Sequence, residues 1–190
     1  MSPCRHLAAA LALVAVAGCR SHATRSTGAA AATGPALAAN ATVVHIDDGD
    51  TIDVRIGGVT ERVRLIGIDT PETKKPNTPV QCYGHEASAF TAAFLPLGTE
   101  VRLERDAEPR DPYRRLLAYV YRAGDGAWLN MELARGGYAR QLSIAPNTAH
   151  ADELGAAVDL ARLARVGLWG ACPAFGSPAL PAGTGAARRG

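Results

Sequence analysis

The sequence predicts a domain of the α+β class that is mainly β, with five strands in a small closed barrel and three helices. Three runs of apolar and β-branched residues follow one another between residues 42 and 68, and two more lie at 101–105 and 115–121. Segments with helical periodicity lie between and after these runs. The expected order is therefore three strands, a helix, two strands and two helices.

The first three strands are expected to form a meander. Asp48-Gly49 and Gly57-Gly58 are tight-turn signals, and they separate runs at 42–47, 51–56 and 59–68. The second run alternates apolar and polar residues, which is typical of a half-buried strand. Two short turns leave no room for a crossover, so these strands are neighbours in the sheet.

The helices are expected at residues 84–95, 128–135 and 152–165. A polar, proline-rich stretch at 74–81 precedes the first of them and is expected to be an exposed loop. We expect the five strands to be all antiparallel, and a set of that size closes into a small barrel. The OB-fold is the five-stranded barrel known for binding oligonucleotides.

The composition fits one globular domain with extra segments. The chain has 190 residues, of which 47% are hydrophobic and 20% are charged. A net charge of +2 excludes a protein that binds nucleic acid through its overall charge, so any such contact must be local. Aromatic residues make up only 5%, which argues against an extended base-stacking platform.

The N-terminus, residues 1–18, has the pattern of a signal peptide. Leu7–Ala17 is an uninterrupted run of Ala, Leu and Val, and about eleven residues are too few to span a bilayer. The small residues that follow and Cys19 resemble a bacterial lipobox, in which the cysteine becomes lipid-modified. We therefore expect a membrane anchor at Cys19. Ordinary secretory cleavage after Ala15-Val16-Ala17 is the alternative.

The remaining domain boundaries follow from composition and from export. Residues 19–40 read as a flexible linker, 41–172 as the folded domain and 173–190 as a disordered tail. Either export route leads to an oxidising environment, where Cys82 and Cys172 are expected to form a disulfide. The expected location is the cell membrane or outer membrane as a lipoprotein, and otherwise outside the cell as a secreted protein.

A polar cluster ends the third strand. Arg64 precedes four largely apolar residues, and Asp69, Thr70 and Glu72 surround Pro71. Proline fixes its own φ and pushes the preceding residue towards an extended conformation, so the strand stops there. Strand parity puts Arg64 and Asp69 on opposite faces. If both act on one ligand, the chain must bend or bulge between residues 67 and 71.

Five ordered segments together resemble the staphylococcal nuclease (thermonuclease) family. They are DGDT at 48–51, RLIGIDTPE at 64–72, YGHEASAF at 83–90, DPYRRLLAYV at 111–120 and GLW at 167–169. The resemblance covers about residues 41–172. It implies an OB-fold barrel and Ca²⁺-dependent hydrolysis of phosphodiester bonds in DNA and RNA.

The resemblance also implies residue roles. Asp50, Asp69 and the Thr70 carbonyl match calcium ligands, and Glu72 matches the general base. The matches to groups that hold phosphate are Arg64, Arg115 and Tyr113. The chemistry agrees independently, because Ca²⁺ takes carboxylate and carbonyl oxygens and the arginine fork matches two phosphate oxygens.

One departure from the family concerns Arg114, which stands where the family usually has glycine. An arginine is strained there if the turn needs a positive φ, but its extra charge would help to hold substrate phosphate. Purely structural roles are the alternative for single residues. Asp48-Gly49-Asp50 can be a simple hairpin turn, and Arg64 can form a surface ion pair. All roles are filled at once, which favours a site.

The sequence therefore predicts an exported calcium-dependent nuclease of low sequence specificity that acts on DNA and RNA as a monomer. The alternative is a non-catalytic OB-fold module that binds nucleic acid. The second hypothesis predicts the loss of catalytic acids or arginines, and this chain has lost none of them.

Overall fold

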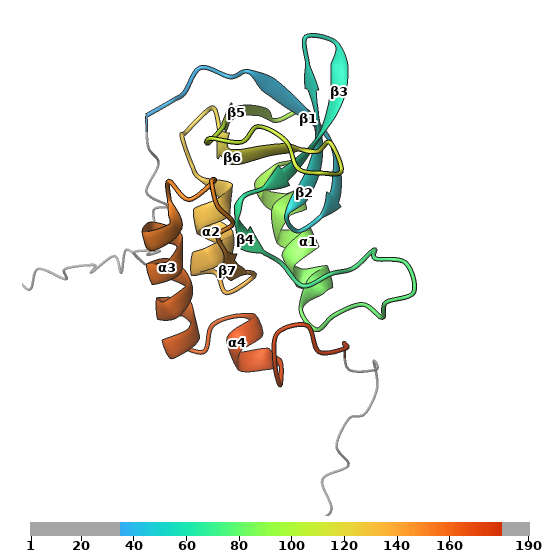
Figure 1. Cartoon of the computed structure of the whole chain (residues 1–190), viewed down its shortest axis with the longest axis vertical. Helices are drawn as coiled ribbons and strands as arrows, with labels where there is room; N and C mark the ends of the chain where they lie inside the picture. Colours follow the sequence, from blue (N-terminus) through green and yellow to red (C-terminus); the bar gives the residue numbers. More distant parts are fainter. Residues whose placement is uncertain (1–34, 180–190) are drawn as a thin grey trace, which may run out of the picture. The chain divides into compact units, whose positions relative to one another are not determined.

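A computed structural model describes residues 35–179, in which five strands form a closed barrel in the order β1-β2-β3-β6-β5 (Figure 1). The barrel strands are β1 (Ala41–Asp48), β2 (Thr51–Ile56), β3 (Val59–Leu65), β5 (Glu100–Glu104) and β6 (Leu116–Arg122). The meander β1–β2–β3 and the β5–β6 pair are antiparallel. The closed, mainly β barrel with helices confirms the predicted fold class.

One seam of the barrel corrects the expectation of an all-antiparallel set. β3 and β6 pair in parallel, with Val63 opposite Leu116 and Leu65 opposite Ala118. The reason lies in the connection, because the chain between these strands passes through α1 and β5 and returns in the direction of β3. The barrel is therefore mixed.

The run expected as one strand at 59–68 is broken in two. β3 ends at Leu65, and a separate strand β4 (Gly67–Asp69) pairs with β7 (Arg140–Leu142), which the sequence did not predict. Gly67 has a φ of 82°, and a Cβ at that position would collide with Leu154. The predicted bend is confirmed, and it begins at Ile66–Gly67.

Four helices cover the barrel and the small sheet. They are α1 (Gly84–Phe94), α2 (Leu129–Arg135), α3 (Ala151–Leu163) and the single turn α4 (Leu168–Ala171). The first three confirm the predicted helices to within two residues at either end. Among residues 35–179, no helix combines the length and apolar character needed to cross a bilayer.

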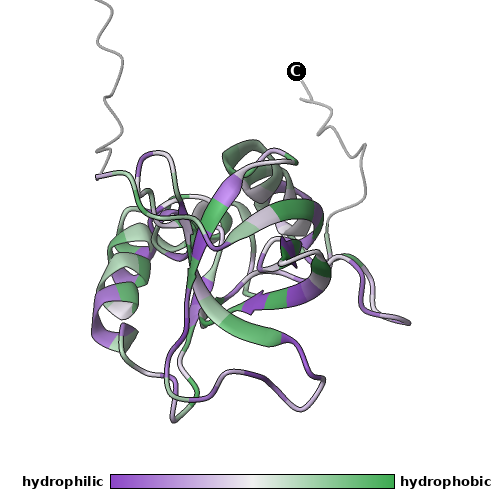
Figure 2. Cartoon of the chain, turned by 90° about the horizontal axis from the view of Figure 1, so that it is seen from above, coloured by the Kyte–Doolittle hydropathy of each residue, from purple (hydrophilic) through white to green (hydrophobic). Residues whose placement is uncertain are grey.

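The core forms where the apolar faces of strands and helices meet. Figure 2 shows hydrophobic and hydrophilic residues interspersed along the strands, and each barrel strand buries some of its side chains. The fully buried side chains include Val43, Ile52, Val54, Val63, Leu65, Val101, Leu129, Leu133 and Leu154. The packed barrel fixes the ends of β2 and β3, which carry the candidate site.

Both ends of the described chain pack on the domain more closely than expected. The Leu37 N–H donates to the Ala123 carbonyl over 2.8 Å, although residue 37 lies in the expected linker. The sequence predicts a disordered tail from residue 173, but residues 177–179 form backbone hydrogen bonds with the segment before α1. The tail prediction is therefore wrong for these residues. The predicted signal peptide, Cys19 and residues 180–190 lie outside the described range.

A disulfide joins Cys82 to Cys172 in the structure, with an S–S distance of 2.08 Å and a sequence separation of 90 residues. Cys82 directly precedes the residue that caps α1, and Cys172 directly follows α4. The bond therefore connects the first and last helices of the domain.

Candidate active site

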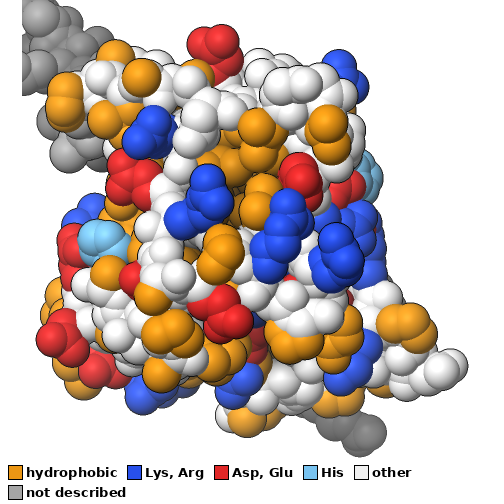
Figure 3. Space-filling view, turned by 45° about the horizontal axis from the view of Figure 1, so that its top comes forward, with side chains coloured by type: hydrophobic (Ala, Val, Ile, Leu, Met, Phe, Trp, Pro, Cys, Tyr) orange, Lys and Arg blue, Asp and Glu red, His pale blue; other side chains and the backbone are white. Residues whose placement is uncertain are grey.

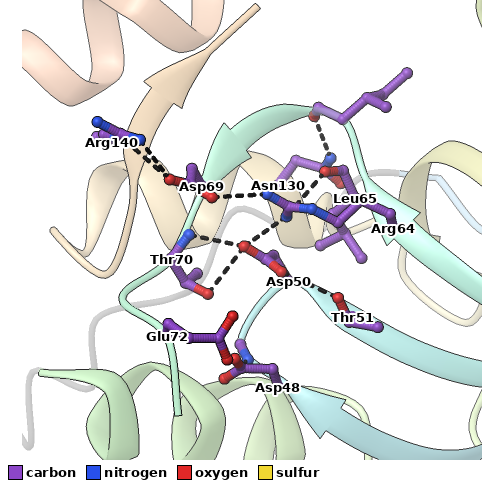
Figure 4. Close-up of polar contacts among 12 residues, drawn as sticks. Asp48, Asp50, Thr51, Arg64, Leu65, Asp69, Thr70, Glu72, Asn130 and Arg140 are labelled. Atoms are coloured by element: carbon purple, nitrogen blue, oxygen red, sulfur yellow. Dashed lines mark hydrogen bonds and ion pairs between the residues drawn. The ribbon is translucent and has the colours of Figure 1, made fainter. Parts of the chain in front are cut away.

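Two carboxylates from separate elements lie side by side. Asp50 stands in the turn before β2, and Asp69 is the last residue of β4. Asp50 Oδ2 accepts hydrogen bonds from the Thr70 backbone N–H over 2.8 Å and from Thr70 Oγ1 over 3.0 Å (Figure 4). These bonds hold the end of β4 against the first hairpin, so all three predicted metal ligands come together.

Arg64 bridges the two carboxylates. Its Nη1 pairs with Asp50 Oδ2, and its Nη2 lies 2.8 Å from Asp69 Oδ1 (Figure 4). Asp69 Oδ2 also accepts from Arg140, whose Nε is 3.0 Å away. Only 13% of the Arg64 side chain is exposed, so little solvent screens its charge. The bend after β3 is what brings Arg64 and Asp69 onto one face.

Burial dominates the electrostatics of Asp50. It raises the pKa of the Asp50 carboxyl above its usual range, and the Arg64 guanidinium and the Thr70 amide partly oppose that shift. The charged form is disfavoured because a buried carboxylate loses its water shell. Positive charge is therefore favourable at this position.

Glu72 is fixed by the backbone that follows it. Its Oε1 accepts from the N–H groups of Thr73, Lys74 and Lys75 over 2.9, 2.8 and 3.1 Å. The start of α1 lies close to this segment, because a Cβ on Gly84 would be only 3.2 Å from the Glu72 carbonyl oxygen. The carboxylate consequently has one defined orientation.

Asp48 connects the Glu72 segment to the rest of the domain. Its Oδ1 accepts from Thr73 Oγ1 over 3.0 Å and from Ser88 Oγ on α1 over 2.8 Å. Asp48 is buried, so the simple turn role considered for it from the sequence is incomplete. It anchors three elements: the first hairpin, the Glu72 segment and α1.

The opposite side of the site carries Arg115 and Tyr113. Arg115 Nε is 2.6 Å from Asp111 Oδ2, and its guanidinium carbon lies 5.6 Å from the centre of the Tyr113 ring. Tyr113 is 82% exposed, so its hydroxyl is available to a ligand. Arg114 has a φ of 68°, which confirms the strain expected of an arginine in place of glycine.

These groups line one cleft with a volume of about 680 Å³. Its charged and polar lining includes Asp50, Arg64, Asp69, Thr70, Glu72, Lys74, Lys75, Tyr113, Arg115 and Arg140. Arg114 is not among the lining residues in the described part of the chain. Basic and acidic side chains are mixed on the face shown in Figure 3, and both kinds line the cleft.

A smaller apolar groove of about 300 Å³ adjoins the cleft. It shares Arg64, Tyr113 and Arg115 with the cleft, and Leu65 and Leu117 form part of its wall. A ligand held by the arginines can therefore place an apolar or flat group in this groove.

The donor set suits a hard cation. Ca²⁺ takes six to eight oxygen ligands, typically from carboxylates, carbonyls and water. Within residues 35–179, no three His, Cys, Asp or Glu side chains are close enough to hold a metal without further ligands. The carboxylates of Asp50 and Asp69, with the Thr70 carbonyl, would supply part of such a shell, and water in the open cleft would supply the rest.

Sequence reasoning missed three residues that shape the site. Arg140 pairs with Asp69, Asn130 donates to the Ile66 carbonyl over 2.9 Å at the bend, and Gln81 accepts from the Glu72 N–H over 2.9 Å. Arg140 lies on the unpredicted strand β7. A buried asparagine in an apolar helix was the one available signal, because such a residue needs hydrogen-bond partners.

The fold and the cleft are those of a barrel domain with paired carboxylates beside arginines. The chain belongs to the staphylococcal nuclease family, because residues 62–171 match the family described as "Staphylococcal nuclease homologue". This match includes Arg64, Asp69, Glu72 and Arg115, and it begins after Asp50.

Three relatives support the family assignment. The chain is 54% identical over 105 residues to the thermonuclease of Staphylococcus intermedius. This match covers 55% of the chain and 61% of the relative. It is 42% identical over 127 residues to the thermonuclease of Staphylococcus hyicus, and this match covers 67% of the chain and 73% of the relative. It is 39% identical over 132 residues to Endonuclease YncB of Bacillus subtilis, and this match covers 68% of the chain and 61% of the relative.

Proposed function

We propose that this protein is a calcium-dependent nuclease that hydrolyses phosphodiester bonds of DNA and RNA with low sequence specificity. The observation that carries the proposal is the cleft in which Arg64 bridges Asp50 and Asp69 while Glu72 and Arg115 line the same space. The names of the relatives, thermonuclease and endonuclease, agree with this class of reaction.

Asp50, Asp69 and the Thr70 carbonyl are the residues that would hold Ca²⁺. When bound, the ion supplies Lewis acidity and orients the reacting groups. The protein contributes a rigid pair of carboxylates, since the hydrogen bonds from Thr70 to Asp50 lock the two loops together. Arg64 and Arg140 balance the negative charge of the pair.

Arg64 and Arg115 would hold the scissile phosphate. A planar guanidinium donates two parallel hydrogen bonds to phosphate oxygens and stays charged at any working pH. Donors of this kind matter most when charge develops on the phosphate in the transition state, where each contributes about 2.7–4 kcal/mol by analogy with oxyanion-hole donors. Tyr113 would donate its hydroxyl to a neighbouring phosphate.

Glu72 would accept a proton from the attacking water. Its three backbone hydrogen bonds fix the direction of the carboxylate, which is what a base needs to meet a water molecule in one geometry. General-base help of this kind typically gives roughly 10²- to 10⁴-fold in rate.

Low specificity follows from the nature of the contacts. The candidate groups are arginines and a metal site, which recognise phosphate and carry no information about the base. The apolar groove beside Arg115 is walled by Leu65 and Leu117 and would accept a base or sugar without reading its edge.

We further propose export to the cell membrane or outer membrane through a lipid anchor at Cys19, with secretion as the other route. We propose that the domain acts as a monomer. The competing function is a non-catalytic module that binds nucleic acid through the same arginines.

The test uses the purified chain from residue 20 to residue 190, with single-stranded DNA, double-stranded DNA and RNA as substrates. Cleavage is measured with Ca²⁺ and with a chelator, for the wild type, Glu72→Ser and Arg115→Ala. Arg102→Ala is the matched control, because Arg102 lies on β5 and is not among the lining residues of the cleft.

We expect Ca²⁺-dependent cleavage by the wild type and by Arg102→Ala, and losses of roughly 10²-fold or more for the two site variants. An inactive wild type would exclude the enzyme, and binding without cleavage would favour the non-catalytic module. Equal cleavage by Arg115→Ala would show that this arginine is misassigned.

A further inference from the structure

The segment after α4, residues 172–179, runs back to the loop that carries Glu72. We call this segment the strap. Its Ser177 carbonyl accepts from the Cys82 N–H over 2.7 Å, and its Ala179 N–H donates to the Val80 carbonyl over 2.8 Å. The disulfide to Cys172 fixes its beginning. Figure 1 shows the strap, in red, beside the start of α1.

Gln81 lies between the strap and Glu72. It forms an isolated bridge with Pro178 of the strap. Its side-chain Oε1 accepts from the Glu72 N–H over 2.9 Å, and its own N–H donates to the Glu72 carbonyl over 2.9 Å. Both backbone polar groups of Glu72 are thus bound by one residue that the strap holds.

The strap also reaches the other side of the cleft. Phe175 packs under the Arg140 guanidinium, whose carbon lies 4.2 Å from the ring centre. Arg140 in turn pairs with Asp69 over 2.9 Å. Phe175 and Gln81 both line the cleft, so the strap connects the walls that carry Asp69 and Glu72.

Asp48 holds the beginning of the Glu72 loop through Thr73, and beyond Thr73 the loop has little other support. Lys74–Asn77 are exposed, and the loop belongs to no strand of the barrel. Loops of this kind are mobile unless their backbone is tied to a rigid element. The backbone bonds at Val80 and Cys82 and the disulfide supply that tie.

We propose that the strap is a positioning element for Glu72, which acts through Gln81 and through the Cys82–Cys172 disulfide. The proposal rests on the proposed nuclease function. The strap lies outside residues 62–171, the range that matches the family. Misplacing a catalytic group by about 1 Å can cost roughly 10²-fold in rate, so a loosened loop lowers turnover.

The first test compares the wild type with the double variant Cys82→Ser and Cys172→Ser, below the melting temperature of both. We expect kcat to fall by roughly 10- to 100-fold with KM within about twofold, because Arg64 keeps its pair with Asp50 and Arg115 keeps its pair with Asp111. Hydrogen exchange should become faster in peptides that cover residues 72–82 and should not change in β1–β3. Unchanged kcat together with unchanged exchange would overturn the proposal.

The second test keeps the proposal falsifiable if the double variant does not fold. Gln81→Ala should lower kcat in the same way, and Gln81→Glu should recover part of it, because Glu keeps an acceptor of the same length. Thr78→Ala is the matched control in the same loop, since its hydroxyl contacts only the Pro76 carbonyl, at 3.5 Å. Equal kcat for Gln81→Ala and Thr78→Ala would overturn the role of Gln81.

The two tests separate failure of the strap from failure of the proposed function. If the wild type does not cleave any substrate with Ca²⁺, the nuclease proposal fails and the positioning role fails with it. The exchange measurement then still shows whether the strap orders residues 72–82. If the wild type cleaves and the strap variants cleave equally well, only the strap proposal fails.

Discussion

Asp50 shows how function conflicts with stability at a single residue. Its carboxylate is buried, and burial disfavours the charged form that a metal ligand must have. Arg64 compensates only in part, and each ionised group loses hydration on folding. In the proposed function, a bound Ca²⁺ would supply the positive charge that stabilises the ionised Asp50.

We therefore predict that Asp50→Asn stabilises the protein without Ca²⁺ at pH 7, because the isosteric amide removes a buried charge. The variant should also lose stabilisation by Ca²⁺, which for the wild type is about 2.7 kcal/mol at 100 times the dissociation constant. Urea unfolding with Ca²⁺ and with chelator measures both effects. A variant that Ca²⁺ stabilises as strongly as the wild type would remove Asp50 from the metal site.

Arg114 carries backbone strain that a glycine would not. Its φ of 68° is costly for a residue with a Cβ, by roughly 1–2 kcal/mol. We predict that Arg114→Gly raises the free energy of unfolding by about 1 kcal/mol, less the greater chain entropy of glycine. Gly58→Ala is the control in the opposite direction, and we expect it to destabilise the protein. Gly58 has a φ of 89° and open space around it, so only backbone strain acts there. Destabilisation by both substitutions would show that the arginine is not strained.

At the scale of elements, the break between β3 and β4 depends on α2. Asn130 is fully buried on that helix, and it accepts from the Val120 N–H and donates to the Ile66 carbonyl, each over 2.9 Å. One side chain thereby connects the barrel to the bend that aims Arg64 and Asp69.

We predict that Asn130→Ala destabilises the protein by about 2 kcal/mol, because two buried backbone groups lose their partners. Activity at a temperature where the variant is folded should fall as well, since the bend loses its support. Thermal unfolding and a cleavage assay measure the two effects, with Thr60→Ala on the exposed side of β3 as the control. Equal losses in both variants would leave Asn130 without a special role.

Asp106 connects the end of the β5–β6 hairpin to the segment before α3. The Ala149 N–H donates to its Oδ2 over 2.9 Å, and the Tyr119 hydroxyl does so over 3.1 Å. The bond from Ala149 is the main reason that the pKa of Asp106 is lowered. Its folded pKa is below its unfolded pKa, so the charged form stabilises the fold.

This contribution is present above the unfolded pKa of about 3.9 and is lost as the pH falls through the lowered folded pKa. We predict that Asp106→Asn is less stable than the wild type at pH 7 and that the difference shrinks in acid. Urea unfolding at pH 7 and pH 3 measures it. A difference that stays constant between these pH values would show that the charge of Asp106 does not matter.

The sequence predicted the positions of the strands and helices better than it predicted which strands pair. Hydrophobic periodicity and the turns at Asp48-Gly49 and Gly57-Gly58 depend on neighbours in the chain, and the elements they predict are present. The parallel seam and β7 depend on contacts between distant residues, and no local pattern carries them. Arg140 was missed for that reason, because its strand has only three residues.

The candidate site was predictable in its residues but not in its supports. Motif order predicted Asp50, Arg64, Asp69 and Glu72, and the structure places them around one cleft. The strap was not predictable, because residues 173–179 have the composition of a tail and are ordered only by partners far away in sequence. The composition of a segment indicates whether it can be ordered on its own, and it contains no information about distant partners.

At the scale of the whole molecule, the disulfide closes a covalent loop that contains all four helices of residues 35–179. In the chain-entropy model, closure of a 90-residue loop stabilises the fold by on the order of 4–5 kcal/mol. We predict a mass increase of about 2 Da on reduction and a marked decrease in melting temperature. Intact-mass measurement with and without a thiol reductant checks the bond, and an unchanged mass would disprove it.

The covalent loop also divides the chain into two parts for assembly. The meander β1–β3 lies before Cys82 and is made from neighbours in sequence, whereas β5 and β6 lie within the loop. The seams β1–β5 and β3–β6 each join one part to the other. Arg64 comes from the first part and Arg115 follows in the second. The proposed phosphate clamp therefore exists only once the barrel has closed, and a chain whose barrel is still open carries no complete active site.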